Sequence, residues 1–231
     1  MSNNVKNTTL PGLLDLLAPH SCRGCGHIGS VLCDCCKNDI IKTHVDVCPK
    51  CKAKKPTSIC PNCLDLPPTH IVGERSGPLG DLIHGFKYQS IRAAAKPLAK
   101  LLDEILPKIK GEVVIVPLPT ITKHIRARGL DHTYLVAKNL AKLRGKNYQV
   151  KPLLLRNQNT VQVGTDQKTR LKQAESAYKV NPKIKINQTT TYLLLDDVWT
   201  TGASLEASTK KLREAGAKKI ELAILALSRI D

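Results

Sequence analysis

The fold of this chain is decided by the stretch Tyr192-Leu193-Leu194-Leu195-Asp196-Asp197-Val198-Trp199-Thr200-Thr201-Gly202-Ala203-Ser204. An apolar run ends in two adjacent acidic residues, and a short loop of hydroxyl-bearing residues and glycine follows them. A helical pattern of apolar residues then opens at the end of the stretch. This order predicts a buried strand, an anion-binding turn and the start of a helix.

The loop of this stretch has the residue types that bind a phosphate group. The first N–H groups of a helix have no intrahelical acceptor and lie at the positive end of the helix dipole, so they attract an anion. Hydroxyl side chains add donors, and a glycine lets the backbone approach the bound group closely. We therefore expect the phosphate to contact Thr200, Thr201, Gly202, Ala203 and Ser204.

The acidic pair requires a different partner, because Asp196 and Asp197 would repel a phosphate at contact distance. Ionised carboxylates accept hydrogen bonds, which suits the hydroxyls of a ribose or the coordination shell of Mg2+. The stretch thus predicts a ribose-5-phosphate site. The structural alternative is an acidic pair that only caps the following helix. Trp199 is either a core anchor or a lid over the sugar, and the sequence leaves both roles open.

At these residues the chain resembles the 5-phosphoribosyl-1-pyrophosphate (PRPP) motif of type I phosphoribosyltransferases, in which apolar residues, two acids and a TTG loop follow one another. The resemblance implies that the ligand is PRPP with Mg2+ and that Asp196 and Asp197 are the catalytic pair. It also implies that an earlier loop holds the pyrophosphate and that a mobile loop closes over the ligand. The positions that match the pyrophosphate loop are Pro117, Leu118, Pro119, Thr120 and Arg128, and those in the mobile loop are Gln162, Lys168 and Arg170.

The segments around the motif predict an α/β body. We expect a helix over residues 91–105, strands over 113–116, 149–155, 177–180 and 220–227, and a helix from Ser204 to Gly216. A strand, a helix and a strand at the motif predict a mostly parallel sheet with helices on both faces. In such a sheet the phosphate loop lies at the carboxyl end of its strand, where ligands bind.

All nine cysteines lie between residues 22 and 63, and eight of them form four CxxC pairs. Two such pairs complete a tetrahedral zinc site with four thiolate ligands. Because the gaps within each half are short, the simplest interpretation is two successive zinc ribbons; a cross-braced pairing and a redox switch are the alternatives. The expected zinc ligands are Cys22, Cys25, Cys33 and Cys36 for one ion, and Cys48, Cys51, Cys60 and Cys63 for the other.

Composition divides the chain into three parts. Residues 1–20 are a polar tail with a short amphipathic helix, residues 21–68 are the double zinc-ribbon module, and residues 70–231 are the phosphoribosyltransferase-like domain. No apolar run has the roughly 18 residues that a membrane span needs, so we expect a cytoplasmic protein without such a span. The 36 Lys and Arg residues against 19 Asp and Glu give a formal net charge of +17, which favours polyanions as partners or reflects a generally Lys-rich proteome.

The ordered set of motifs is similar to that of the ComF competence protein family, from the CxxC pairs to the PRPP motif. Between these lie His84-Gly85-Phe86-Lys87-Tyr88, Val116-Pro117-Leu118-Pro119, Arg128-Gly129-Leu130-Asp131-His132, Gln162 and Arg170. This resemblance implies two zinc ribbons joined to a phosphoribosyltransferase domain. It also implies a competence protein of natural transformation, which binds single-stranded DNA and PRPP, works with other competence proteins and helps imported DNA into the cytoplasm. The alternatives are an active phosphoribosyltransferase with an unidentified acceptor and a PRPP-sensing regulator without turnover.

Overall fold

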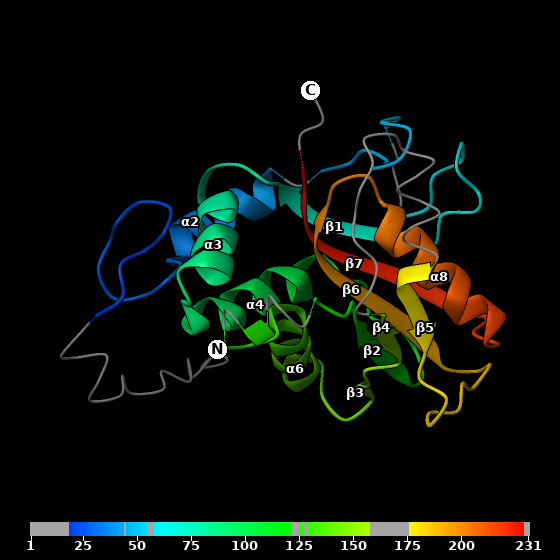
Figure 1. Cartoon of the computed structure of the whole chain (residues 1–231). Helices are drawn as coiled ribbons and strands as arrows, with labels where there is room; N and C mark the ends of the chain where they lie inside the picture. Colours follow the sequence, from blue (N-terminus) through cyan, green and yellow to red (C-terminus); the bar gives the residue numbers. More distant parts are fainter. Residues whose placement is uncertain are drawn as a thin grey trace, which may run out of the picture.

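The computed structural model describes residues 19–43, 45–54, 58–121, 125–126, 129–157 and 176–228. Its centre is a parallel sheet of five strands in the order β1-β7-β6-β2-β3 (Figure 1). These strands are β1 (Thr69–Glu74), β2 (Val113–Pro117), β3 (Tyr148–Val150), β6 (Thr191–Trp199) and β7 (Lys219–Leu227). The predicted α/β class with a mostly parallel sheet is therefore confirmed.

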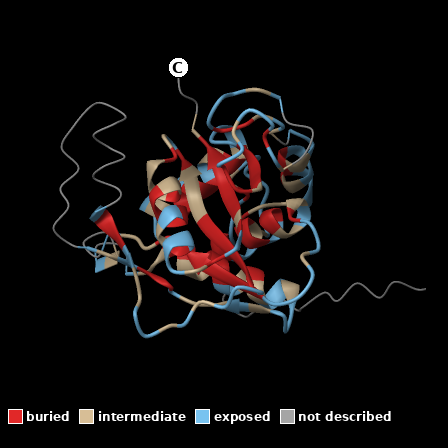
Figure 2. Ribbon diagram, turned by 90° about the vertical axis from the view of Figure 1, so that its right-hand side faces the viewer, coloured by how far each residue is buried: buried red, intermediate tan, exposed pale blue. Residues whose placement is uncertain are grey.

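Helices cover both faces of the sheet, and side chains alternate between two apolar cores. On one face, Leu193 and Leu195 of β6 pack with α3 (Gly77–Tyr88), α4 (Ala95–Ile105) and α6 (His132–Arg144). On the other face, Tyr192 and Leu194 pack with α8 (Ala203–Glu214) and with the antiparallel pair β4 (Leu154–Arg156) and β5 (Tyr178–Val180). Figure 2 shows the sheet as the buried centre of the molecule.

The helix expected over 91–105 is shorter in the structure. A 3-10 turn, η1 (Arg92–Ala94), precedes α4, which begins at Ala95. Ser90 has a positive φ of 55°, so the chain turns sharply between α3 and η1 instead of continuing as one helix.

The single strand expected over 149–155 is two strands in two different sheets. β3 is the edge strand of the main sheet, whereas β4 pairs with β5. Pro152 lies between them and has no N–H group for a sheet hydrogen bond, which explains the interruption. The expected strand over 177–180 is confirmed as β5.

Strand β1 follows Pro67 and Pro68 and pairs with β7 along its length. This strand was not predicted from the sequence. None of the helices in the described part of the chain has the length and apolar character that a membrane span requires.

The cysteine-rich segment packs against the body at two separate places. In the first half, Val31 and Ile40 belong to the same apolar core as the buried residues of α3 and α4. Ile40 lies in α2 (Asp34–Lys42). The second half, with Cys48 and Cys60, joins the core beneath α8, and Lys50 forms an ion pair of 3.1 Å with Glu206 of that helix. Figure 1 shows the two halves on different sides of the sheet.

Candidate functional site

The acidic pair lies near the carboxyl end of β6, in the middle of the sheet. Asp196 follows Leu195, which is paired with Pro117, the last residue of β2. Because side chains alternate along a strand, Asp196 belongs to the face of Leu194 and Asp197 to the face of Leu195. The two adjacent carboxylates therefore meet different neighbours.

Asp197 is paired with a cation from α3. Its Oδ2 lies 2.8 Å from Nζ of Lys87, and both side chains are largely buried, with exposed fractions of 19% and 16%. Lys87 is in the last turn of α3, where the preceding Phe86 lies in the core. Buried His132, at the start of α6, donates from Nε2 to the Phe86 carbonyl at 2.6 Å and also packs edge-on against the Phe86 ring. These contacts fix the end of α3 that presents Lys87.

Asp196 faces the β4–β5 pair on the other side of the strand. Arg156 of β4 donates to the hydroxyl of Tyr178 at 3.0 Å and its guanidinium lies 5.3 Å from the centre of that ring. Burial raises the pKa of Tyr178, while a hydrogen bond with Ser204 opposes the rise. Tyr178 therefore connects the hairpin to the first turn of α8, next to the acidic pair.

Burial of its carboxyl group raises the pKa of Asp196 to about 8, and the adjacent Asp197 carboxylate adds to the rise. The backbone N–H of Asp197, which donates to Asp196 Oδ1 at 2.8 Å, lowers it, as do Lys87 and Arg156. The Asp196 carboxyl thus takes up a proton more readily than a free aspartate, and it lies between two cations that approach from opposite faces of the sheet.

The predicted phosphate loop follows immediately, at the start of α8. Within the described residues, the backbone N–H groups of Ser204 and Leu205 have no acceptor. Gly202 has a φ of 79°, and a Cβ atom there would lie only 2.2 Å from the Trp199 ring. Trp199 is 1% exposed, so it is a core anchor, and its ring packs directly against Gly202 of the loop.

The loop that follows β2 starts beside the residue that precedes the acidic pair. The N–H of Leu118 donates to the Leu195 carbonyl at 2.9 Å. The hydroxyl of Thr133 in α6 lies 2.9 Å both from the Leu118 carbonyl and from Oδ1 of Asp131, which caps α6, so its one O–H donates between these two acceptors. Pro117 and Leu118 therefore lie beside Leu195, the residue that precedes the acids, while Thr120 donates to Asp131 at 3.4 Å. Pro119 lies between them in the chain. Arg128, Gln162, Lys168 and Arg170 lie outside the described residues.

The eight paired cysteines form two groups of four, and neighbouring pairs combine in each. The sequential pairing is thus confirmed over the cross-braced one.

The sulfur atoms of each group are close enough to share one ion. In each group all four lie within 4.8 Å of one another, and the Sγ–Sγ distances are 3.7 Å for Cys25–Cys33 and 3.6 Å for Cys51–Cys60. Tetrahedral zinc with bonds of about 2.3 Å requires sulfur atoms about 3.8 Å apart. The backbone N–H of Ala53 lowers the pKa of Cys51 to about 7, whereas burial raises the pKa of Cys60 and that of Cys63 in the same group. Both groups could bind zinc, and exposed Cys35 belongs to neither.

The first cysteine group rests directly on α3. A Cβ atom on Gly24 would lie 2.6 Å from the Cys36 sulfur and 2.8 Å from Cβ of Pro78, in the first turn of α3. At the other end of the helix, Arg23 donates to the side chain of Gln89. The helix that carries Lys87 is therefore held by the segment around the first group.

Lys87, Arg156 and Tyr178 are the site residues whose roles the sequence analysis missed. Lys87 belongs to a motif that supports the family resemblance, but no spacing in the chain relates it to Asp197. The alternation Tyr178, Lys179, Val180 was available as a strand signal, although it does not say which sheet the strand joins.

No protein-family model matches the chain, and no curated protein matches it. Among solved structures, the chain is similar to one described as the allosteric regulatory enzyme of purine biosynthesis, with 17% sequence identity and a TM-score of 0.38. The similarity covers 58% of this chain and 25% of that chain, so it spans a quarter of the enzyme's length.

Proposed function

We propose that this chain binds PRPP with Mg2+ at the carboxyl end of β6, as a cytoplasmic competence protein of the ComF type that binds single-stranded DNA. The observation that carries the ligand proposal is one short segment in which two acids precede a helix start with unpaired N–H groups. The PRPP motif and the ordered motifs of the ComF family, both described above, support the proposal as resemblances.

Each part of PRPP has a partner of suitable chemistry. The N–H groups of Ser204 and Leu205 suit the 5-phosphate, and the carboxylates of Asp196 and Asp197 suit the ribose hydroxyls. The loop Pro117–Thr120, which follows β2 next to Leu195, would hold the diphosphate with its Mg2+. Lys87 and Arg156 supply positive charge on either side. The two cysteine groups hold zinc and stabilise the segments around them.

Calorimetry with Mg2+-PRPP tests this site. A variant with Asp196→Asn and Asp197→Asn keeps the shape of both side chains but weakens their hydrogen bonds to the sugar. Hydrogen bonds to charged groups contribute about 1.5–3 kcal/mol each, so we expect at least a roughly 100-fold loss of affinity. The matched control, Asp34→Asn with Asp81→Asn, removes two exposed acids elsewhere and should bind like the wild type. Unchanged affinity in the site variant would overturn the proposal.

A second candidate function is phosphoribosyl transfer to an unidentified acceptor. Two cations beside the acids favour it, because they would stabilise the negative charge of a departing diphosphate. Release of labelled pyrophosphate from PRPP in the presence of bases, amines or nucleic acids distinguishes this enzyme from a regulator that only senses PRPP. Binding without any release supports the regulator.

A further inference from the structure

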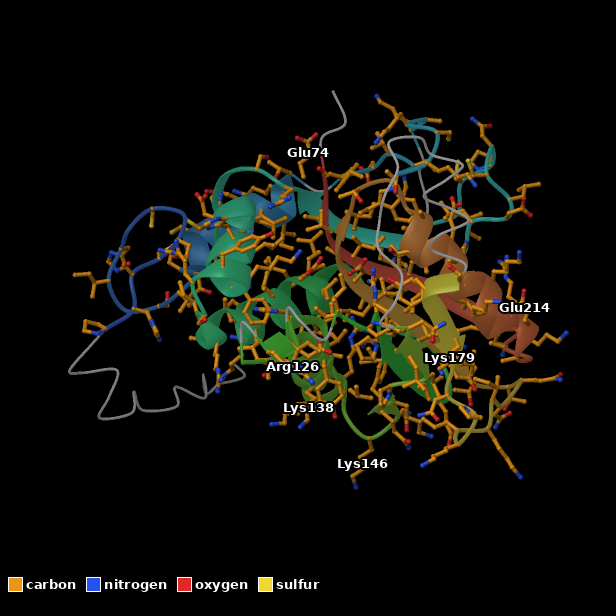
Figure 3. The ribbon with its side chains drawn as sticks, in the orientation of Figure 1. Glu74, Arg126, Lys138, Lys146, Lys179 and Glu214 are labelled. Carbon is orange, nitrogen blue, oxygen red and sulfur yellow. The ribbon has the colours of Figure 1, made fainter. Side chains whose placement is uncertain are left out.

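Residues 132–157 and 176–190 contain nine Lys and Arg residues and no Asp or Glu. In the structure they form neighbouring elements: α6, the edge strand β3, the β4–β5 pair and the chain that leads into β6. Figure 3 shows Lys138 and Lys146 at the bottom of the view and Lys179 at the lower right, below Glu214, while Glu74 lies at the top. This side of the fold therefore carries positive charge in segments that have no acidic residue of their own.

Hydrogen bonds and packing hold these segments together. The N–H of Asn181 donates to the Leu153 carbonyl at 2.7 Å, and the N–H of Lys151 donates to the Ile115 carbonyl at 3.1 Å. Ile184 and Ile186 pack against the core, so the alternating Lys183 and Lys185 are exposed. The segments are thus attached to the sheet and are not a loose lysine-rich tail.

Six lysines on this side are exposed, and no ion pair with a carboxylate is found for them among the described residues: Lys138, Lys142, Lys146, Lys179, Lys183 and Lys185. Of these, Lys138 lies over the Tyr134 ring, with Nζ 5.4 Å from the ring centre. We call Lys146, Lys179, Lys183 and Lys185 the basic edge. Other cations are already neutralised, as Lys37 is by Glu104 and Lys50 by Glu206. Two acidic residues lie near these segments: Glu112, just before β2, accepts a backbone hydrogen bond from Thr191, and Asp103 is paired with Arg144 of α6. Unpaired lysines on a surface poor in acids attract a polyanion through release of its counterions.

We propose that the basic edge binds the phosphate backbone of single-stranded DNA. This deepens the proposed function by placing its DNA partner, and it rests on that function for the choice of DNA. The contacts are with backbone phosphates and not with stacked bases, because the chain has one Trp, one Phe and five Tyr residues. The cysteine-rich segment, whose lysines also suit nucleic acid, is the competing location.

Alternation along β5 relates the basic edge to the PRPP site. Tyr178 is buried beside Arg156 and next to the acidic pair, whereas the following residue, Lys179, is exposed. One strand thus presents one residue to each site. DNA bound to the basic edge would therefore lie on the outer face of the β4–β5 pair, and PRPP would lie on its inner face.

Fluorescence anisotropy with a labelled oligothymidine, measured over a range of salt concentrations, tests the proposal. The edge variant changes Lys146, Lys179, Lys183 and Lys185 to Ala; the control variant changes the exposed Lys42, Lys54, Lys96 and Lys100 to Ala. Each single-strand phosphate contact contributes about 0.7 to the slope of log affinity against log salt. We expect the edge variant to lose at least roughly tenfold in affinity and to have a slope smaller by up to about 3. The control variant should keep most of both.

Three results would overturn the proposal: no binding by the wild type, equal losses in both variants, or a larger loss in the control, which would move the contact to α4 and the cysteine-rich segment. Displacement of the oligothymidine by RNA at much lower concentrations than by unlabelled DNA of the same length would assign the surface to RNA instead. A thermal unfolding curve of the edge variant is the control that checks whether it is folded. Calorimetry with Mg2+-PRPP separates the two proposals, because the edge lysines are outside the ligand site and the variant should keep wild-type PRPP affinity.

Discussion

Lys87 and Asp197 form an ion pair of 2.8 Å that joins the last turn of α3 to the end of β6. The same lysine lowers the pKa of Asp196, so it interacts with both carboxyl groups of the acidic pair. This contact links the first cysteine group, α3 and the acidic pair into one continuous structure.

Removing this cation leaves two adjacent carboxylates without one of their counter-charges. We expect Lys87→Met to lower the free energy of unfolding by about 1–3 kcal/mol at neutral pH, since the pair is largely buried. Urea unfolding measures the change, with the exposed Lys100→Met as the control. In a double-mutant cycle, Lys87→Met should cost much less when Asp197 is already Asn. Equal costs in both backgrounds would show that the two residues are not coupled.

The raised pKa of Asp196 makes stability depend on pH in a defined direction. A carboxyl with a folded-state pKa of about 8 is neutral in both states at acidic pH. As pH rises from about 4 through 8, the unfolded state loses this proton first, so the native state is progressively destabilised. Asp196→Asn should therefore be increasingly more stable than the wild type over this range, with a constant difference above it. Thermal unfolding of both proteins from pH 4 to 9 measures the difference, and a constant or falling difference would contradict the raised pKa.

Gly202 tests the phosphate loop without changing any charge. In Gly202→Ala the new Cβ meets the Trp199 ring and the residue has a left-handed φ, so we expect a loss of about 2 kcal/mol or more and much weaker PRPP binding. Gly111→Ala is the matched control, because its φ of 85° is similar but nothing lies within 4 Å of the added Cβ. The control isolates backbone strain and should leave PRPP affinity unchanged. Similar losses in both variants would argue against the contact with Trp199.

Metal content distinguishes the cysteine groups from isolated thiols. We expect two zinc ions per chain in the wild type and in Cys35→Ser, and one in Cys33→Ser, by elemental analysis of the purified protein. Because the first group supports α3, Cys33→Ser should also weaken PRPP binding, whereas Cys35→Ser should not. Full zinc content in Cys33→Ser would refute the four-thiolate assignment.

The two proposed sites share β5, so their occupancies should influence each other. We expect Mg2+-PRPP to change the affinity of the wild type for oligothymidine, measured by anisotropy, and the Asp196→Asn/Asp197→Asn variant to lack this response. Oligothymidine should change PRPP affinity by the same factor. DNA affinity that ignores saturating PRPP would mean that the sites are independent.

The parts of the fold and site that follow from local order could be predicted from the sequence. The acidic pair and the loop that starts α8 are contiguous in the sequence, so this segment could be recognised. The CxxC spacing limits which thiols can share one ion, so the two cysteine groups could be recognised too. The neighbours of the acids come from distant segments: Lys87 arrives on α3 and Arg156 on β4. Their meeting with β6 depends on how the elements pack, and one chain read alone does not contain that information. The segment around Pro152 is a smaller example. Its apolar run predicted one strand, whereas the structure has two strands, β3 and β4, that belong to different sheets.

The two halves of the cysteine-rich segment cover opposite faces of the same sheet, which affects how the protein can be taken apart. Removing residues 1–68 would uncover apolar side chains beneath α3 on one side and beneath α8 on the other. The change in composition near residue 70 is thus unsuitable as a cutting point for producing the ligand-binding part alone. A fragment starting there should aggregate, and interpretable experiments require the metal-loaded, full-length chain. The same arrangement restricts evolution: neither half could be lost or exchanged without compensating changes in the face that it covers.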